Sequence, residues 1–462
     1  MATQKKHVLT RLLSASTVAT RTRAASGRAL TALAAACVTL AASTFTSPAF
    51  AQDKPAELKV GIATFTTGSA SVFGVPGKAA GEILIDKINA EGGIGGVKVV
   101  PTWIDEGVGG DRLLSEYRRL VQEQGVKVML ATISSGNCLI VAPVAEDLKV
   151  LNLAWDCGTE KLLEESRRKY VVRPAGNATT EMMATLVYLL KNKPDFKTVA
   201  IVNQDYSWGR DSRDILVDAL SVLKPDVKIV AEMFPKFGAS DFSTEISRLQ
   251  ALKPDVIIST SWGGDLDTFV RQAAQRGLFS RSTFVLPLAE SSIERLGSVL
   301  PEGVIVGGRG DHYFLHPETR NDPAHLAFIK AFKEKTGAYP IYPTYHMAQS
   351  ITALKAGYEK AIETNGGKWP SVEQVAEAIR SLTFKAYGRP ITMREDGQGL
   401  EAQLLGTTKK VAEYPFPVMD NMMVIPAEII TAPVGQLSHD WIKTVKIDLI
   451  NNDQIKTYSY KP

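Results

Sequence analysis

The chain has few cysteines and histidines, and it lacks the motifs of the common hydrolases and metalloenzymes. Of its 462 residues, three are cysteine and six are histidine. It contains no Gly-x-Ser-x-Gly elbow, no His-Glu-x-x-His and no Ser-x-x-Lys with its partner motifs. Its glycine pairs near residues 74–78 and 93–95 have neither the spacing of a phosphate-binding loop nor that of a dinucleotide fingerprint. We therefore predict a protein that is not an enzyme and binds no cofactor.

Long hydrophobic runs are missing after residue 52, so that part should not insert into a membrane. The first 51 residues are different, because they are basic, contain no acidic residue and carry an Ala/Leu-rich stretch over about residues 29–46. Ala49-Phe50-Ala51 fits a small-x-small cleavage site. We predict a secretion signal that is cleaved after Ala51, and hence a periplasmic protein that starts at Gln52.

Two other interpretations of this leader stay open. The apolar stretch is shorter than the roughly 20 residues that span a bilayer, so we do not expect a retained membrane anchor, and a buried core helix is the alternative to a signal. Cys37 could be a lipoprotein cysteine, but Ala34-Ala35-Ala36 lacks the leucine usually found ahead of one.

An excess of one charge is also missing. The formal charge of +4 includes six of the 53 Lys and Arg residues in the leader, which leaves 47 basic against 49 acidic residues, a net charge of −2. No long Lys/Arg run follows residue 52. We therefore expect neither nucleic acid nor an anionic membrane as a partner, but a diffusible small molecule or another protein.

The remaining cysteines and histidines allow few specialised sites. After the leader only Cys138 and Cys157 are left, and an even pair in an oxidising compartment suggests a disulfide; two unpaired, small apolar residues are the alternative. His312 and His316 could share a helix face with Asp311. They lie near a break in the chain's pattern, and we predict no metal site.

Short β-rich apolar segments alternate with amphipathic helical segments along most of the chain. This alternation predicts an α/β fold with parallel sheets covered on both faces. The expected strands cover residues 58–64, 97–104, 126–132, 150–154, 199–203, 229–233, 256–260 and 284–286. The expected helices cover residues 79–89, 111–124, 178–190, 211–223, 242–252, 266–275, 324–335 and 345–364.

The alternation is interrupted three times, near residues 173–179, 303–310 and 397–399. It resumes after the first break with the same rhythm, which suggests two similar lobes. Prolines then interrupt the segment after residue 412, where we expect irregular or edge structure. In doubly wound sheets ligands bind beyond the carboxyl ends of the strands, so the loops after the expected strands are the candidate site.

Several motifs in order resemble one family. They are Ile88-Asn89-Ala90-Glu91-Gly92-Gly93, a strand that closes on Asp105, Asp241-Phe242-Ser243 before a helix, and Lys253-Pro254-Asp255-Val256. The chain resembles, over residues 57–400, the periplasmic solute-binding proteins of branched-chain (Leu/Ile/Val-type) amino acid ABC transporters. The resemblance implies a type I periplasmic binding fold, in which two Rossmann-like lobes joined by three crossovers close on a solute like a Venus flytrap.

The resemblance also implies which residues contact the ligand. Ser134 and Ser135 occupy the loop that holds a ligand carboxylate in the family; a turn that caps the next helix is the alternative. Asp205 belongs to a turn before Trp208, and Trp208 and Phe73 would cover the ligand from the two lobes. Either aromatic residue could instead be core packing.

Three carboxylates bear on the ligand's chemistry. Asp156 departs from the family pattern, because it would repel a ligand carboxylate and favour an amine, amide or hydroxyl; alternatively it caps the next helix. Asp265 and Glu290 match the positions that take an α-amino group, and either could instead face a helix dipole. An amino acid or related amine or amide is therefore expected first, and an aromatic or other carboxylic acid second.

The resulting hypothesis is a receptor that delivers a small solute to the permease and ATPase subunits of an ABC importer. A sensory subunit of the same fold and a hydrolase on this fold are the alternatives. We expect the N-terminal lobe in residues 52–176 and 308–398, and the C-terminal lobe in residues 177–307 and 399–462. The breaks near residues 173–177, 307–311 and 397–400 would form the hinge.

Overall fold

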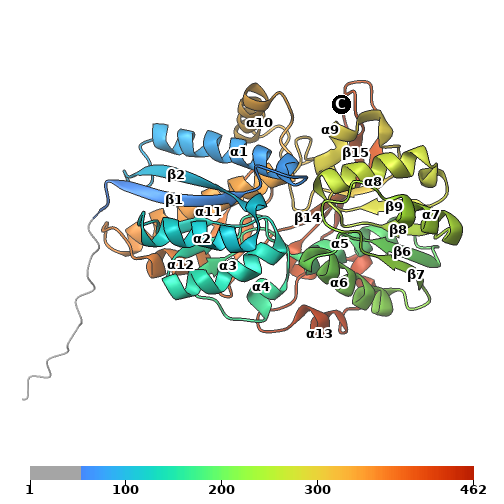
Figure 1. Ribbon diagram of the computed structural model, residues 1–462, viewed down its shortest axis with the longest axis horizontal. Helices are drawn as coiled ribbons and strands as arrows, with labels where there is room; N and C mark the ends of the chain where they lie inside the picture. Colours follow the sequence, from blue (N-terminus) through green and yellow to red (C-terminus); the bar gives the residue numbers. More distant parts are fainter. Residues whose placement is uncertain (1–53) are drawn as a thin grey trace, which may run out of the picture. The chain divides into compact units, whose positions relative to one another are not determined.

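The first lobe is built on a parallel sheet. The computed structural model describes residues 54–462, so the predicted signal, its cleavage site after Ala51 and the expected start of the mature chain at Gln52 lie outside the described residues. The first sheet has the order β2-β1-β3-β4-β5, and every pair of neighbours in it is parallel. Figure 1 labels two of its strands, β1 and β2. Its strands are β1 (Glu57–Thr64), β2 (Lys98–Asp105), β3 (Val128–Leu130), β4 (Leu151–Leu153) and β5 (Val171–Val172).

The second lobe has a larger, mixed sheet in the order β16-β15-β14-β10-β9-β8-β6-β7. The strands from β7 to β10 are parallel, and β14, β15 and β16 add antiparallel pairs. A small third sheet joins β11 (Thr383–Phe384), β12 (Ile391–Met393) and β13 (Gly399–Leu400). The eight strands are β6 (Thr198–Val202), β7 (Lys228–Met233), β8 (Val256–Ile258), β9 (Thr283–Leu286), β10 (Ile305–Gly307), β14 (Gln403–Lys409), β15 (Val418–Ile425) and β16 (Lys456–Tyr458).

The first lobe draws its helices from two distant parts of the chain. Helix α1 packs on α10 and α11, and α12 packs on α11 and on the edge strand β5 (Figure 1). The apolar stripe of α1 explains this packing, because Ala80, Leu84 and Ile88 are buried while Asp86 is exposed. The helices are α1 (Ser71–Ala90), α2 (Gly110–Gln122), α3 (Ser135–Leu148), α4 (Lys161–Glu164), α10 (Pro323–Thr336), α11 (Tyr342–Thr364) and α12 (Val372–Arg380).

In the second lobe, α5 begins at a capping box in which Asn177 accepts from the Thr180 backbone N–H and the Thr180 hydroxyl accepts from the Asn177 N–H. We expected α5 to be amphipathic, but it is buried almost throughout because α6, β14 and the segment 447–451 cover it. The helices are α5 (Ala178–Asn192), α6 (Ser207–Leu223), α7 (Ser243–Leu252), α8 (Gly263–Gln275), α9 (Ile293–Leu296) and α13 (Ser438–Ile442).

The chain passes between the two sheets three times, after β5, after β10 and between β13 and β14. These crossovers are hydrogen-bonded to each other. The Arg173 N–H donates to the Gly397 carbonyl and the Gly399 N–H to the Arg173 carbonyl, while the Leu404 N–H donates to the Gly310 carbonyl. The predicted fold, two Rossmann-like lobes joined by three crossovers, is confirmed. The lobe boundaries that we expect stay a prediction.

Three local expectations differ from the structure. Helix α1 begins at Ser71, ahead of the expected residue 79. Helix α3, with Pro143 inside it, lies outside the expected helix ranges, although a helix after Ser135 was one interpretation of that turn. The C-terminal segment is more regular than expected, since β15 is an interior strand. Pro417 and Pro426 lie just outside that strand, so they do not remove any of its backbone donors. Within residues 54–462, no helix combines the length and the apolar character needed to cross a membrane.

Candidate functional site

A small cavity lies where the loops of both sheets and one crossover meet. Its volume is about 10 Å³, roughly the space of one water molecule. A solute of amino-acid size is larger, so its entry requires the walls to move apart. The first lobe, the second lobe and the crossover contribute Ile133, Ser135, Asp156, Tyr206, Trp208, Trp262, Leu288, Arg309 and Tyr342.

Larger hollows of about 540 and 720 Å³ lie elsewhere. They are open and are lined by side chains of both charges, such as Arg389 and Glu428 in one and Arg168 and Glu377 in the other. Neither hollow gathers the loops at the carboxyl ends of the parallel strands. We therefore place the candidate site at the small cavity between the lobes.

Four of the nine residues that line the cavity are aromatic, and hydrogen bonds fix the orientation of both indole rings among them. The Trp208 indole N–H donates to the Thr260 carbonyl at 2.9 Å, and the Trp262 indole N–H donates to the Tyr206 hydroxyl at 2.5 Å. Behind the wall, Phe73 stacks on Trp262 with ring centroids 5.0 Å apart. Offset stacking of this kind adds to the free energy of burial, so the rings form a preorganised apolar wall.

The Phe73–Trp262 contact joins the two lobes, because Phe73 lies on α1 and Trp262 precedes α8. A backbone hydrogen bond from the Gly264 N–H to the Ser69 carbonyl, at 3.1 Å, reinforces it. Gly263 makes the close approach possible with φ +68°, a conformation that favours glycine. The lobes are therefore in direct contact at the edge of the cavity.

Arg309 supplies the positive charge in this wall. It lies in the second crossover and is 7% exposed. Its Nη1 group donates to Asp156 Oδ1 at 2.6 Å, and its Nε–H is 3.1 Å from both oxygens of Glu181. The guanidinium also lies over the rings of Trp208 and Tyr342, at 4.8 and 5.6 Å. Burial opposes the charge, but the two carboxylates outweigh it and raise the pKa of Arg309 above its ordinary value.

Asp156 lies at the cavity and is fully buried. Its Oδ1 atom contacts both Arg309 and the Nδ1 atom of His346, whereas its Oδ2 atom has no partner among the described residues. Glu181, on α5 of the second lobe, is the other carboxylate that contacts Arg309. Burial raises the pKa of Glu181 to about 7, although Arg309 beside it acts in the opposite direction. A chain of charges therefore runs from the first lobe through the crossover to the second.

The loop after β3 carries the predicted serines, and the two differ in position. Ser135 begins α3 and lines the cavity, and its hydroxyl oxygen accepts from the Thr159 N–H at 3.2 Å. The Ser134 N–H donates to Glu106 at 2.7 Å, and the neighbouring Ile133 N–H does so at 2.9 Å. Glu106 thus occupies backbone donors that we expected to hold a ligand carboxylate. Burial raises the pKa of Glu106 to about 8, while these donors stabilise its ionised form.

Asp265 and Glu290 lie behind the wall and are bonded to protein donors. Asp265 accepts from Gln204 at 2.8 Å and from the Gly238 N–H at 2.7 Å. Glu290 accepts from the Tyr342 N–H at 2.9 Å and thereby holds the start of α11; burial raises its pKa to about 8. Neither carboxylate lines the cavity.

Asp205 lies outside the cavity, where it pairs with Arg210 with about half of each side chain exposed. Among the residues that we predicted, the structure thus brings Ser135, Asp156 and Trp208 together at the cavity. It places Phe73, Asp265 and Glu290 behind the wall, and turns Ser134 and Asp205 to other partners.

The prediction from sequence missed Arg309, Tyr342, Glu181, Glu106 and His346. Arg309 lies in the segment Gly307-Gly308-Arg309-Gly310-Asp311. A lone arginine between glycines at a crossover is the one sequence feature that could have indicated this site residue. The other four belong to helices or to a strand end with no distinctive pattern.

A disulfide joins Cys138 on α3 to Cys157 in the loop after β4, with their Cα atoms 6.3 Å apart. Each cysteine is close in sequence to a residue of the cavity wall, Ser135 and Asp156 respectively. The bond therefore ties together the two first-lobe loops that form the wall.

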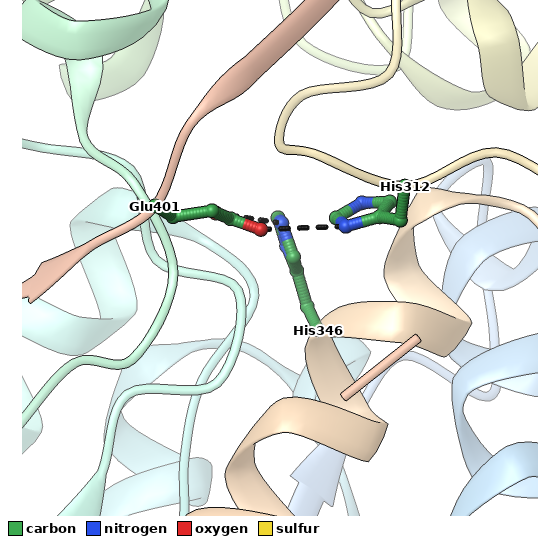
Figure 2. Close-up of side chains that lie close together, drawn as sticks. All are labelled: His312, His346 and Glu401. Carbon is green, nitrogen blue, oxygen red and sulfur yellow. Dashed lines mark ion pairs between the residues drawn. The ribbon is translucent and has the colours of Figure 1, made fainter. Parts of the chain in front are cut away.

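His312, His346 and Glu401 form a buried cluster beside Arg309 (Figure 2). The His312 Nδ1 atom is 3.3 Å from Glu401 Oε1, and the His346 Nε2 atom is 3.8 Å from Glu401 Oε2. His346 Nε2 lies closer to the Arg309 carbonyl, at 2.7 Å, so that nitrogen carries hydrogen. Since a metal ligand needs a lone pair there, the cluster fits a hydrogen-bonded network, and we assign no metal to it.

Comparisons with known proteins give one consistent family. Residues 57–409 match the family model described as periplasmic binding protein. A leucine-, isoleucine-, valine-, threonine- and alanine-binding protein of Pseudomonas aeruginosa is 23% identical over 334 residues, covering 71% of this chain and 83% of that protein. A Leu/Ile/Val-binding protein of Rhizobium johnstonii is 25% identical over 344 residues, covering 74% and 88%.

Solved structures share the fold at low identity. A solute-binding protein of an ABC transporter from Rhodopseudomonas palustris, in complex with 3,4-dihydroxybenzoic acid, has a TM-score of 0.70 and 21% identity, covering 83% of this chain and 100% of that chain. A leucine-binding protein from Thermotoga maritima has a TM-score of 0.66 and 21% identity, covering 80% and 99%. At such identities the likeness establishes the fold, and the ligand has to be argued from the cavity.

Proposed function

Because the chain belongs to the periplasmic binding protein family, we propose that it is the substrate-binding component of an ABC importer and that it captures a small aromatic carboxylate between its lobes. The resemblance read from the sequence is confirmed at the level of the family. The family consists of binding proteins, in keeping with the missing enzyme motifs. The proposal places the mature chain in the periplasm, with the permease and ATPase subunits of the importer as its partners.

The observation that carries the ligand class is the aromatic wall around Arg309. Four rings line the cavity, and a flat ring fits between such walls by stacking. They belong to Tyr206, Trp208, Trp262 and Tyr342.

The polar groups at the cavity are mainly donors. The Arg309 Nη2 group has no bonded partner among the described residues, and the Ser135 hydroxyl receives a hydrogen bond, so its own hydrogen is free to donate. A guanidinium and a hydroxyl suit a carboxylate. The Asp156 Oδ2 atom is an acceptor without a partner, which would suit a hydroxyl or amino group on the ligand.

The same contacts weaken the case for the amino group of an amino acid or related amine, the ligand class that we ranked first from the sequence. An ammonium group needs a carboxylate that is free to receive it. Asp156 Oδ1 already contacts the Arg309 guanidinium and the His346 ring, and Asp265 and Glu290 lie behind the wall on protein N–H donors. An aromatic carboxylate therefore agrees better with the cavity than an aliphatic amine does.

Calorimetric titration of the purified mature chain tests this proposal. The panel is benzoate, 4-hydroxybenzoate, phenylalanine, leucine and benzylamine. We expect the two benzoates to bind most tightly and benzylamine not to bind, because benzylamine shares the ring but carries the opposite charge. Tighter binding of leucine would return the ligand to the aliphatic amino acids, and binding of none would remove the support for an aromatic carboxylate.

A further inference from the structure

The ring of His346 lies between two hydrogen-bond acceptors. Its Nδ1 atom contacts Asp156 Oδ1, and its Nε2 atom is 2.7 Å from the Arg309 carbonyl oxygen. A carbonyl cannot donate, so Nε2 must carry hydrogen. Asp156 Oδ1 also receives the Arg309 guanidinium at 2.6 Å, and a cation at that distance favours the ionised carboxylate. Beside an ionised Asp156, hydrogen on both ring nitrogens satisfies both acceptors, and this makes the ring an imidazolium.

The charged groups around the ring come from every element packed against it. Asp156 lies after β4, Glu181 on α5 and Glu401 at the third crossover, and these three carboxylates favour the cation. Arg309, from the second crossover, opposes it. His312 packs edge-on against the ring, and burial lowers the pKa of His312. Tyr342 lies one turn earlier on α11 and also packs on the ring. Burial alone would lower the pKa of His346, but Asp156 outweighs burial and the pKa of His346 is raised.

Loss of one proton would break this arrangement. A neutral imidazole has a single N–H, so it can serve either the Asp156 carboxylate or the Arg309 carbonyl, but not both. His346 is 1% exposed, so the abandoned acceptor has no ready access to water. Asp156 and Arg309 are both cavity residues, so the change is transmitted to the ligand site.

We propose that His346 is a positioning residue for ligand binding, which as an imidazolium holds Asp156 and the Arg309 backbone in place, so that ligand affinity falls when it loses its proton. This inference rests on the proposed function, because it assumes that the cavity is the ligand site. His346 does not line the cavity; it acts through two residues that do.

The direction of the pH dependence follows from the sign of the shift. The pKa of His346 is raised above its ordinary value of 6.5. Its contribution is therefore fully present below about pH 6.5, and it is lost as the pH rises through the higher pKa of the folded protein. A benzoate is fully ionised over this range, so the ligand itself adds no titration.

The first experiment titrates the best ligand of the panel by calorimetry from pH 6 to pH 10. For the native chain we expect the Kd to rise roughly tenfold across the transition, the size of a hydrogen bond to a charged group. His346→Gln should bind more weakly at pH 6 and lack that transition. His439→Gln is the matched control, because His439 is a partly exposed histidine paired with Asp218 on the second lobe, and it should follow the native profile. Parallel profiles of native protein and His346→Gln would overturn the inference.

The second experiment does not need a ligand. In native protein with ¹⁵N-labelled histidine, His346 should show two protonated ring nitrogens at pH 7, assigned by their loss in His346→Gln or, if that variant does not fold, in His346→Asn. One protonated nitrogen, or a stoichiometric metal in the purified protein, would overturn the inference. If the native chain binds no ligand of the panel, that result contradicts the proposed function and not this inference. The nitrogen spectrum still shows whether the His346 ring is protonated on both nitrogens.

Discussion

Arg309 combines three roles at a single residue. Its backbone carbonyl binds His346, its guanidinium joins carboxylates of both lobes, and its flat face contacts aromatic rings of the wall. Its φ of 45° lies in the left-handed region, which only the surrounding contacts maintain in a residue with a side chain. Such a residue is poorly replaceable, even by another cation.

Arg309→Lys should therefore weaken binding of an aromatic carboxylate by about tenfold or more. Lysine keeps the charge, but it lacks the planar fork that serves Asp156 and Glu181 together and it cannot stack. Calorimetry at pH 6.5 measures the change. Arg213→Lys is the control, since Arg213 pairs with Glu232 and Asp214 on a partly exposed face of α6. An affinity unchanged from the native protein in Arg309→Lys would show that the guanidinium does not contact the ligand.

The family resemblance, together with the loops after the expected strands, pointed to part of the cavity. Ser135, Asp156 and Trp208 line it, because each follows a strand of a parallel sheet and such loops meet at one edge. That these residues contact a ligand stays a prediction. The partners of the carboxylates could not be predicted. Whether Asp265 faces a ligand or the Gly238 N–H depends on packing between segments far apart in sequence, and the sequence carries no local signal for that.

At the scale of elements, the disulfide between α3 and the loop after β4 stabilises the first-lobe wall. The two cysteines are 19 residues apart. Closing a loop of that length restricts the unfolded chain by roughly 3 kcal/mol. Cys138→Ala/Cys157→Ala should lower the free energy of unfolding by about that amount, measured by urea denaturation. The native protein treated with reductant should lose a similar amount, and equal stability of all three samples would contradict a structural role of the bond.

Elements with a clear period were predictable, and those whose pattern is interrupted were not. Interior strands such as β3, β4 and β8 read as short apolar segments, because every residue in them is buried. Helix α3 was not given a range, and its sequence is a poor helix signal because Pro143 lies inside it, where a proline usually ends a helix. Strand β15 was missed because the prolines around it suggested irregular structure, although they mark its ends.

At the scale of the whole described molecule, contacts between the lobes should contribute to ligand affinity. Phe73 stacks on Trp262 across the lobes, and ligand binding favours the form in which this contact exists. Phe73→Leu keeps the apolar character but loses the stacking, so the Kd should rise about two- to tenfold.

The control for this prediction loses a similar contact inside one lobe. Phe279 and Phe284 have ring centroids 4.0 Å apart in the second lobe, so Phe279→Leu should lower stability and leave affinity unchanged. Calorimetry and thermal unfolding of both variants separate the two effects. Equal losses of affinity in both would mean that the Phe73 contact has no special part in closure.

The order of the chain in the first lobe has a consequence for its biogenesis. Helix α11, which packs against α1, is made only after the complete parallel part of the second sheet, and the backbone of Arg173 finds its partner at Gly399 only later still. During synthesis the apolar surface of the first sheet therefore stays uncovered until α11 and the segment around Gly399 have been made. The first lobe is therefore completed only near the end of synthesis. Until then its early segments stay unfolded, and a translocation channel or a holding chaperone can accept them in that state.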